Sequence, residues 1–193
     1  MTLTTTDTAP RAHDAVMKSL HWLTLALIIA VFALASAIDL VPKPMQDTVT
    51  QLHRSIGLTI WVVTLARLAW RQFARLPDWP ASLSPAARTA TKASEYALYA
   101  LLLLQPILGL VHTYADGETM RLFFLLNIPA MIAEDKAFAK GVLAAHGAVA
   151  NALLVLIGLH ATMGLFRQFW QRDNALAALL PGGIGSGPSV EPR

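Results

Sequence analysis

Long uncharged stretches of apolar residues dominate the hydropathy pattern of the chain. They run from Ser19 to Ile38, from Tyr96 to Ala115 and from Gly141 to Phe166. Each provides about the 20 residues that an α-helix needs to cross a hydrocarbon core of about 30 Å. The pattern therefore predicts three membrane-spanning helices and does not resemble the alternating strands or amphipathic helices of a soluble domain.

A further span is predicted after the first stretch, where the apolar run is shorter. The run from Ser55 to Ala66 crosses the membrane only if its helix extends from about Thr48 to Trp70, with Arg54 and Arg67 near the ends. We therefore expect an all-α integral membrane protein, a four-helix bundle over residues 19–180 with spans over about 19–38, 48–70, 94–115 and 141–167.

The remaining segments are expected to lie outside the bilayer core. Residues 1–18 form a polar N-terminal tail without the basic start of a signal peptide, and residues 181–193, rich in Gly, Pro and Ser, are expected to be disordered. The segment from Leu122 to Ala133 is apolar but too short to span, so we expect it along the membrane interface.

Basic residues predict the orientation of the bundle. With four spans both termini share one side, which carries ten basic residues: Arg11, Lys18, Arg67, Arg71, Arg75, Arg88, Lys92, Arg167, Arg172 and Arg193. The other side carries five: Lys43, Arg54, Arg121, Lys136 and Lys140. Because basic residues are enriched on the cytoplasmic side, both termini are expected to be cytoplasmic.

Composition then narrows the chemistry. The chain is 55% hydrophobic and 14% charged and contains no cysteine, which excludes disulfides, iron–sulfur clusters and covalently attached c-type haem. The formal charge is +3, but the basic residues flank apolar segments and form no nucleic-acid groove, so we expect the lipid bilayer and no nucleic acid as a partner.

Five of the six histidines lie in the predicted spans, and four of these form two pairs at two depths. His53 and His146 lie at one level near the outer side, and His21 and His160 share a level near the inner side. His146 and His160 are fourteen residues apart, which corresponds to about 21 Å along a helix with about 40° of angular drift. The spacing predicts two stacked sites in the bundle core, each formed by a facing pair.

Two neutral imidazoles on opposite sides of a metal suit haem iron, for which the porphyrin supplies the other four nitrogens. Zinc fits less well, because a structural zinc site usually needs four protein ligands. We therefore expect two haem b groups, held without covalent attachment. A haem-free scaffold with packing histidines is an alternative, because a single histidine in a membrane helix is more often a hydrogen-bonded packing residue.

Other polar residues have candidate roles around these sites. Arg54, Arg67 and Arg71 are candidates to bind haem propionates, although arginines near helix ends also extend to lipid headgroups. His112 is the substitute ligand if His53 does not serve. Glu95 is expected to pair with Lys92 at i, i+3.

The ordered motifs resemble those of the bacterial cytochrome b561 family of small four-helix di-haem membrane proteins. The matching pieces are LHW around His21, LHRSIGL and ARLAWR in the second span, YALYALLLLQPILGL in the third, HGAVANALLVLIGLH from His146 to His160, and the closing RDNALAALLPG. Together they cover about Val16 to Gly182.

The resemblance implies a multi-pass protein of the bacterial inner membrane that exchanges electrons with ubiquinone. It implies that His21 and His160 bind the iron of a cytoplasmic-side haem, and His53 and His146 that of a periplasmic-side haem. Superoxide oxidation coupled to ubiquinone reduction is the activity it suggests, with Ser19 and Arg167 as possible quinone contacts. The alternative is a non-enzymatic electron-carrier subunit that receives electrons from a periplasmic redox protein.

The outer segments differ from what a superoxide oxidase is expected to show. They carry five basic residues and six acidic ones, Asp39, Asp47, Asp116, Glu118, Glu134 and Asp135, a balance of −1. A positive surface would increase the association rate of an anionic substrate. The charge count does not predict such a surface.

Overall fold

The computed structural model describes residues 14–74, 79, 83–171, 176 and 179–180. The elements are α1 (Ala15–Ala37), α2 (Lys43–Arg71), α3 (Pro85–Ala115), β1 (Met120–Leu122), β2 (Leu126–Ile128) and α4 (Lys136–Phe166), followed by a π-helical turn (Arg167–Gln171). Residues 1–13 of the expected polar tail and all of the expected disordered tail over 181–193 lie outside the described residues.

The helices begin where the sequence supplies capping residues. Asp14, Ser84 and Asp135 precede α1, α3 and α4, and each side chain accepts a hydrogen bond from a backbone N–H of the first turn. These bonds satisfy donors that have no partner within the helix. α2 instead starts after Pro42 and has Pro44 in its first turn, where a missing N–H costs nothing.

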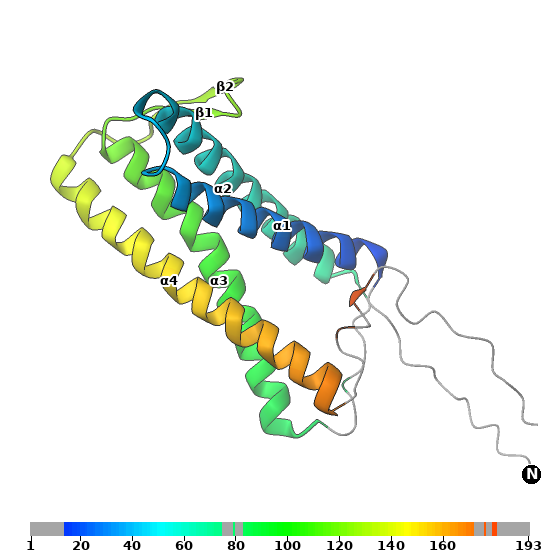
Figure 1. Ribbon diagram of the computed structural model, residues 1–193. Helices are drawn as coiled ribbons and strands as arrows, with labels where there is room; N and C mark the ends of the chain where they lie inside the picture. Colours follow the sequence, from blue (N-terminus) through cyan, green and yellow to red (C-terminus); the bar gives the residue numbers. More distant parts are fainter. Residues whose placement is uncertain (1–13, 75–78, 80–82, 172–175, 177–178, 181–193) are drawn as a thin grey trace, which may run out of the picture.

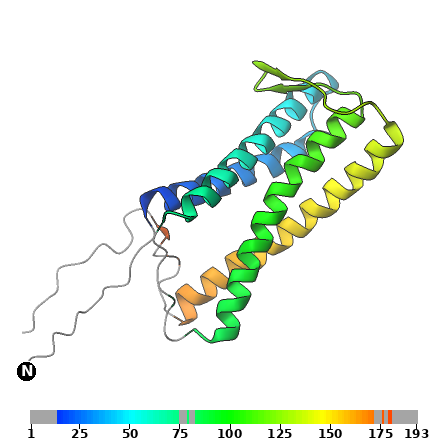
Figure 2. The same cartoon turned by 180° about the vertical axis from the view of Figure 1, so that it is seen from behind.

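The four helices form two antiparallel pairs. α1 packs on α2 and α3 packs on α4, while α2 and α3 join the two pairs. The pairs diverge toward the ends of α2 and α4, as both views show (Figures 1 and 2). The all-α bundle expected from the sequence is therefore present, with its two pairs closer together at the end that carries the β-strands.

A buried apolar layer lies at the centre of the bundle. It consists of one residue from each helix, Ile28, Ile60, Leu102 and Leu153. Leu153 is seven residues after His146 and seven before His160, which places the layer about 10 Å along α4 from each histidine. The layer therefore separates the two predicted histidine levels.

Three of the four expected spans meet the requirements of a membrane helix by length and apolar composition alone. Among the described residues these are Ala15–Ala37, Pro85–Ala115 and Lys136–Gln171. α2 is 29 residues long, about 43 Å, so its length is sufficient. What distinguishes it is the polar sequence QDTVTQLHRS over residues 46–55, in the third of the helix that the expected topology places on the outer side.

A β-hairpin covers part of this polar stretch. β1 and β2 pair antiparallel, with Met120 opposite Ile128. Gln51 and Ser55 of α2 are both buried and hydrogen-bond the hairpin: Gln51 Nε2 donates to the Thr119 carbonyl at 3.0 Å, and Ser55 Oγ accepts from the Phe123 N–H at 2.9 Å. The apolar segment expected to lie along the membrane interface is thus a hairpin attached to the outer part of α2.

Candidate metal centres

The outer histidines face each other across the bundle. His53 on α2 and His146 on α4 have ring centroids 6.3 Å apart, with the ring planes inclined by 72°. A metal–imidazole bond is about 2.0–2.1 Å, and the ring centre lies about 1.2 Å behind the ligating nitrogen, so two imidazoles on opposite sides of one metal have centroids about 6.4 Å apart. The observed separation fits a single metal bound between these two rings.

Backbone carbonyls orient both imidazoles. His53 Nδ1 lies 3.0 Å from the Val31 carbonyl oxygen, and His146 Nδ1 lies 3.1 Å from that of Gln105. A carbonyl oxygen only accepts, so the proton is on Nδ1 in both rings and the Nε2 lone pair is left for a metal. The Gln105 side chain also donates to the His146 carbonyl at 3.0 Å, which fixes α3 against α4 at this level.

The surroundings of this pair fit a flat cofactor that brings its own ligands. Among the described residues no group of three or more His, Asp or Glu side chains could hold a metal ion. Two imidazoles alone match the axial positions of a porphyrin-bound iron. Gly109 of α3 lies directly beside the His146 ring, since a Cβ there would approach Cε1 to 3.2 Å.

His112, the substitute ligand proposed from the sequence, is held by a backbone carbonyl in the same way as His53 and His146. Its Nδ1 lies 3.2 Å from the Ala139 carbonyl oxygen near the start of α4. The ring that faces His146 is that of His53, so the geometry favours His53 as the partner.

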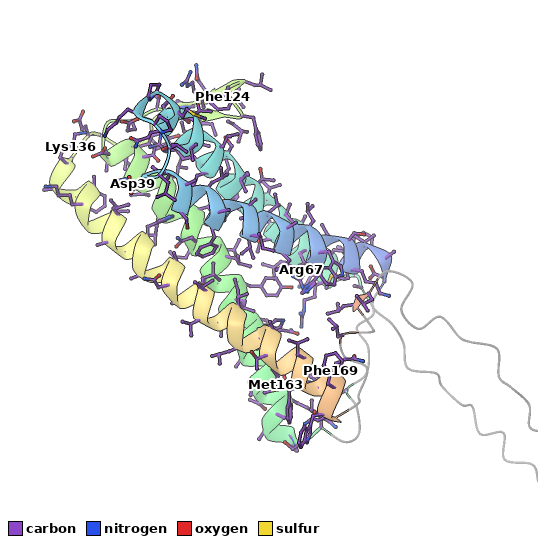
Figure 3. All side chains as sticks on the ribbon, in the orientation of Figure 1. Asp39, Arg67, Phe124, Lys136, Met163 and Phe169 are labelled. Atoms are coloured by element: carbon purple, nitrogen blue, oxygen red, sulfur yellow. The ribbon has the colours of Figure 1, made fainter. Side chains whose placement is uncertain are left out.

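The inner level is arranged differently. Arg67 of α2 donates to His21 Nδ1 at 3.0 Å, and its guanidinium lies over the ring of Tyr99, 5.5 Å from the centroid. His160 is half-buried and experiences the charges of both Arg67 and Glu95. Figure 3 shows Arg67 extending from α2 where the helix pairs diverge. His21 and His160 thus share a polar region, and a cofactor bound between them remains a prediction.

Arg71 has a carboxylate partner within the protein. It forms an ion pair of 2.9 Å with Glu95 of α3 and lies over the ring of Tyr96. Burial on its own lowers the pKa of Arg71, but the Glu95 carboxylate outweighs burial and holds that pKa above its usual value. The expected pairing of Glu95 with Lys92 was wrong, because α2 brings Arg71 closer, and Lys92 instead lies over the ring of Trp79.

The other predicted site residues are Arg54 within α2, Ser19 in the first turns of α1, and Arg167 just after α4. Arg54 is 3.8 Å from Glu118 and donates to the Thr119 carbonyl at 3.4 Å, beside the outer pair. Ser19 is exposed on α1, and Arg167 is half-buried at the end of α4. Propionate and quinone contacts by these residues stay predictions.

Two residues of these sites were not found from the sequence. Gln105 is an uncharged polar residue in the middle of the apolar run of α3, and that position was a usable signal. Tyr99 is buried and lies under the Arg67 guanidinium, but a tyrosine in such a run is also an ordinary packing residue. Only the arrangement of α2 against α3 shows its role.

Comparison with known proteins agrees with this arrangement. A sequence model of prokaryotic cytochrome b561 matches residues 12–182. The chain belongs to the prokaryotic cytochrome b561 family. It is therefore a bacterial membrane protein that binds haem b and transfers electrons, which confirms the resemblance drawn from the motifs.

Individual relatives cover nearly the whole chain. Cytochrome b561 homolog 2 of Escherichia coli is 30% identical over 89% of this chain and 92% of the relative. A protein of Yersinia pestis named probable superoxide oxidase CybB is 25% identical over 89% of this chain and 97% of the relative. Cytochrome b561 homolog 1 of Escherichia coli is 28% identical over 84% of this chain and 93% of the relative.

Proposed function

We propose that this cytochrome b561 family member is a superoxide:ubiquinone oxidoreductase with two haem b groups in the bacterial inner membrane. Two superoxide anions each lose one electron on the periplasmic side and leave as oxygen, and ubiquinone takes up the two electrons and two protons to form ubiquinol. Four membrane spans with both termini in the cytoplasm are part of the proposal. The observation that carries it is the facing His53–His146 pair, with ring centroids 6.3 Å apart.

Each residue has a defined task in this proposal. Haem b supplies the one-electron couple when bound. His53 and His146 bind the outer iron and are held in one tautomer by backbone carbonyls. His21 and His160 bind the inner iron, for which His21 must give up its hydrogen bond from Arg67 and carry its proton on Nδ1, leaving Nε2 for the metal. Arg54 at the outer level, and Arg67 and Arg71 at the inner level, are the propionate partners. Arg71 would then share its charge between Glu95 and a propionate.

Ser19 and Arg167 are the proposed quinone contacts at the inner ends of α1 and α4. Both lie in the membrane interface of the expected topology, where a quinone headgroup can accept hydrogen bonds from a hydroxyl and a guanidinium. Arg167→Ala should raise the KM for quinone more than it lowers kcat if this contact aids binding.

Haem quantitation tests the cofactor assignment. A reduced-minus-oxidised spectrum of the purified protein should show about two haems per chain. His53→Ala and His160→Ala should each lose one centre, and the two lost centres should differ spectroscopically. Retention of both centres in His53→Ala would transfer the outer ligand role to His112, and a colourless parent protein would support the haem-free scaffold.

An electron-carrier subunit is the second candidate, and the outer charges favour it. Three of the outer cations are within ion-pair distance of carboxylates: Arg54 with Glu118, Arg121 with Asp47, and Lys136 with both Asp116 and Glu134. Pairing reduces the positive potential that would attract superoxide. Quinone-dependent loss of superoxide with the purified protein supports the enzyme, whereas turnover only with an added periplasmic redox protein supports the carrier.

A further inference from the structure

The tip of the β1–β2 hairpin exposes a row of large apolar side chains. Phe123, Phe124, Leu125 and Leu126 follow one another at the turn, and Leu125 is 91% exposed. Both phenylalanines have positive φ, 46° and 63°, a conformation that Gly or Asn would adopt with less strain. A tight turn alone therefore does not account for aromatic residues at these two positions.

The hairpin lies beside the outer part of α2. The Phe123 N–H donates to Ser55 Oγ, and Ser55 is twelve residues after Lys43, about 18 Å along the helix from its start. Ser55 is also two residues past His53 and inside the span expected from the sequence. Figure 3 shows Phe124 on the hairpin next to this end of α2. The apolar tip is thus placed beside the membrane-embedded part of the protein.

The backbone of the tip suits an apolar environment. The N–H groups of Phe123, Phe124 and Leu125 all have acceptors, namely Ser55 Oγ and the carbonyls of Arg121 and Leu122. Unsatisfied backbone N–H groups are costly in hydrocarbon, where no water replaces the missing partner. A turn with these amides paired can enter the headgroup and acyl boundary.

Polar groups are confined to the base of the hairpin. Arg121 pairs across the strands with Asn127 and forms an ion pair of 3.1 Å with Asp47 near the start of α2. The hairpin is therefore charged where it meets the outer end of the bundle and apolar at its tip. This order matches the transition from headgroups to acyl chains.

We propose that the tip of the β1–β2 hairpin inserts into the outer leaflet, with phospholipid acyl chains as its partner. The inserted hairpin covers the polar outer third of α2, where Gln51 and Ser55 would otherwise face lipid. It thereby allows α2 to span the membrane despite its polar sequence. The proposal requires the bundle to be embedded in a bilayer and does not depend on the electron donor or on the number of haems.

Single-cysteine labelling tests the insertion, because the chain contains no native cysteine. Leu125→Cys carries a nitroxide in holoprotein reconstituted in phospholipid nanodiscs, with Phe124→Cys as a second tip position. Ile29→Cys on α1 is the lipid-facing reference, and Glu134→Cys before α4 is the water-facing reference. The readout is accessibility to oxygen relative to a water-soluble nickel complex.

Both tip labels should be several-fold more accessible to oxygen, relative to nickel, than the Glu134→Cys label and should approach the Ile29→Cys value. This should hold in nanodiscs that contain one copy of the protein. Nickel accessibility equal to that of the Glu134→Cys label would overturn the proposal. Protection that appears only with two copies per disc would overturn it in favour of contact with a second copy.

Discussion

Gly109 gives the most direct test of the outer site, because a methyl group there must displace the His146 ring. The Cβ of Gly109→Ala would lie 3.2 Å from His146 Cε1, closer than a relaxed carbon contact, and at an ordinary contact distance of 3.5 Å from Nδ1. The ring cannot move freely, since its Nδ1 is bonded to the Gln105 carbonyl at 3.1 Å. Overpacking costs about 1–3 kcal/mol and a stretched hydrogen bond about 0.5–1.5 kcal/mol.

A net cost of about 2 kcal/mol corresponds to a roughly 30-fold weaker haem affinity at the outer site, because 1.4 kcal/mol is a factor of ten. This agrees with the roughly 10–100-fold effect of disturbing residues that orient a metal ligand. Haem titration of the apoprotein, followed by the spectral signature of each centre, measures the change. The inner centre should be unaffected.

Gly141→Ala is the matched control. Gly141 lies within α4, as Gly109 lies within α3, and a Cβ at Gly141 would contact nothing within 4 Å. This variant therefore makes the same change in helix propensity without a clash. Gly109→Ala and Gly141→Ala could instead bind the outer haem equally tightly. That result would show that the position of the His146 ring beside Gly109 does not control haem binding at this site.

The remaining predictions concern the polar contacts. Glu95→Gln leaves Arg71 half-buried without its carboxylate and should lower the free energy of unfolding in detergent by about 1–2 kcal/mol, whereas the double variant with Arg71→Gln should recover part of the loss. Gln51→Leu removes two hydrogen bonds to the hairpin and should speed amide hydrogen exchange at β1 but not at α4. The rate of superoxide oxidation should change less than about twofold between about 50 and 500 mM salt, because the outer charges are largely paired. A tenfold decrease in this rate would indicate that a positive outer surface attracts superoxide.

The helical spans could be predicted well because uncharged apolar runs have few other interpretations. The stretches that became α1, α3 and α4 stand out by hydropathy alone. α2 was more difficult, since its outer third reads as polar until the hairpin covers Gln51 and Ser55. Hydropathy summed along a helix cannot show that another segment of the chain shields its polar residues.

The histidine sites were predictable to the extent that they depend on helical periodicity. The fourteen-residue spacing of His146 and His160 places both on one side of α4. The choice between His53 and His112 depends on how α2 and α3 pack, and only the structure shows His53 opposite His146. The ion pair of Arg71 with Glu95 could not be predicted for the same reason, because the two residues are on different helices and their contact depends on how α2 and α3 pack.

In the proposed two-haem arrangement, the apolar layer of Ile28, Ile60, Leu102 and Leu153 would separate the two redox centres and make electron flow between them sensitive to the transmembrane voltage. The two histidine levels lie about 21 Å apart across a hydrocarbon core of about 30 Å. An electron moving inward between them crosses about 0.7 of a potential that is negative inside, which opposes the transfer by about 1.6 kcal/mol for each 100 mV. In the proposed orientation, a strongly energised membrane would therefore slow the reduction of quinone, and a depolarised one would accelerate it.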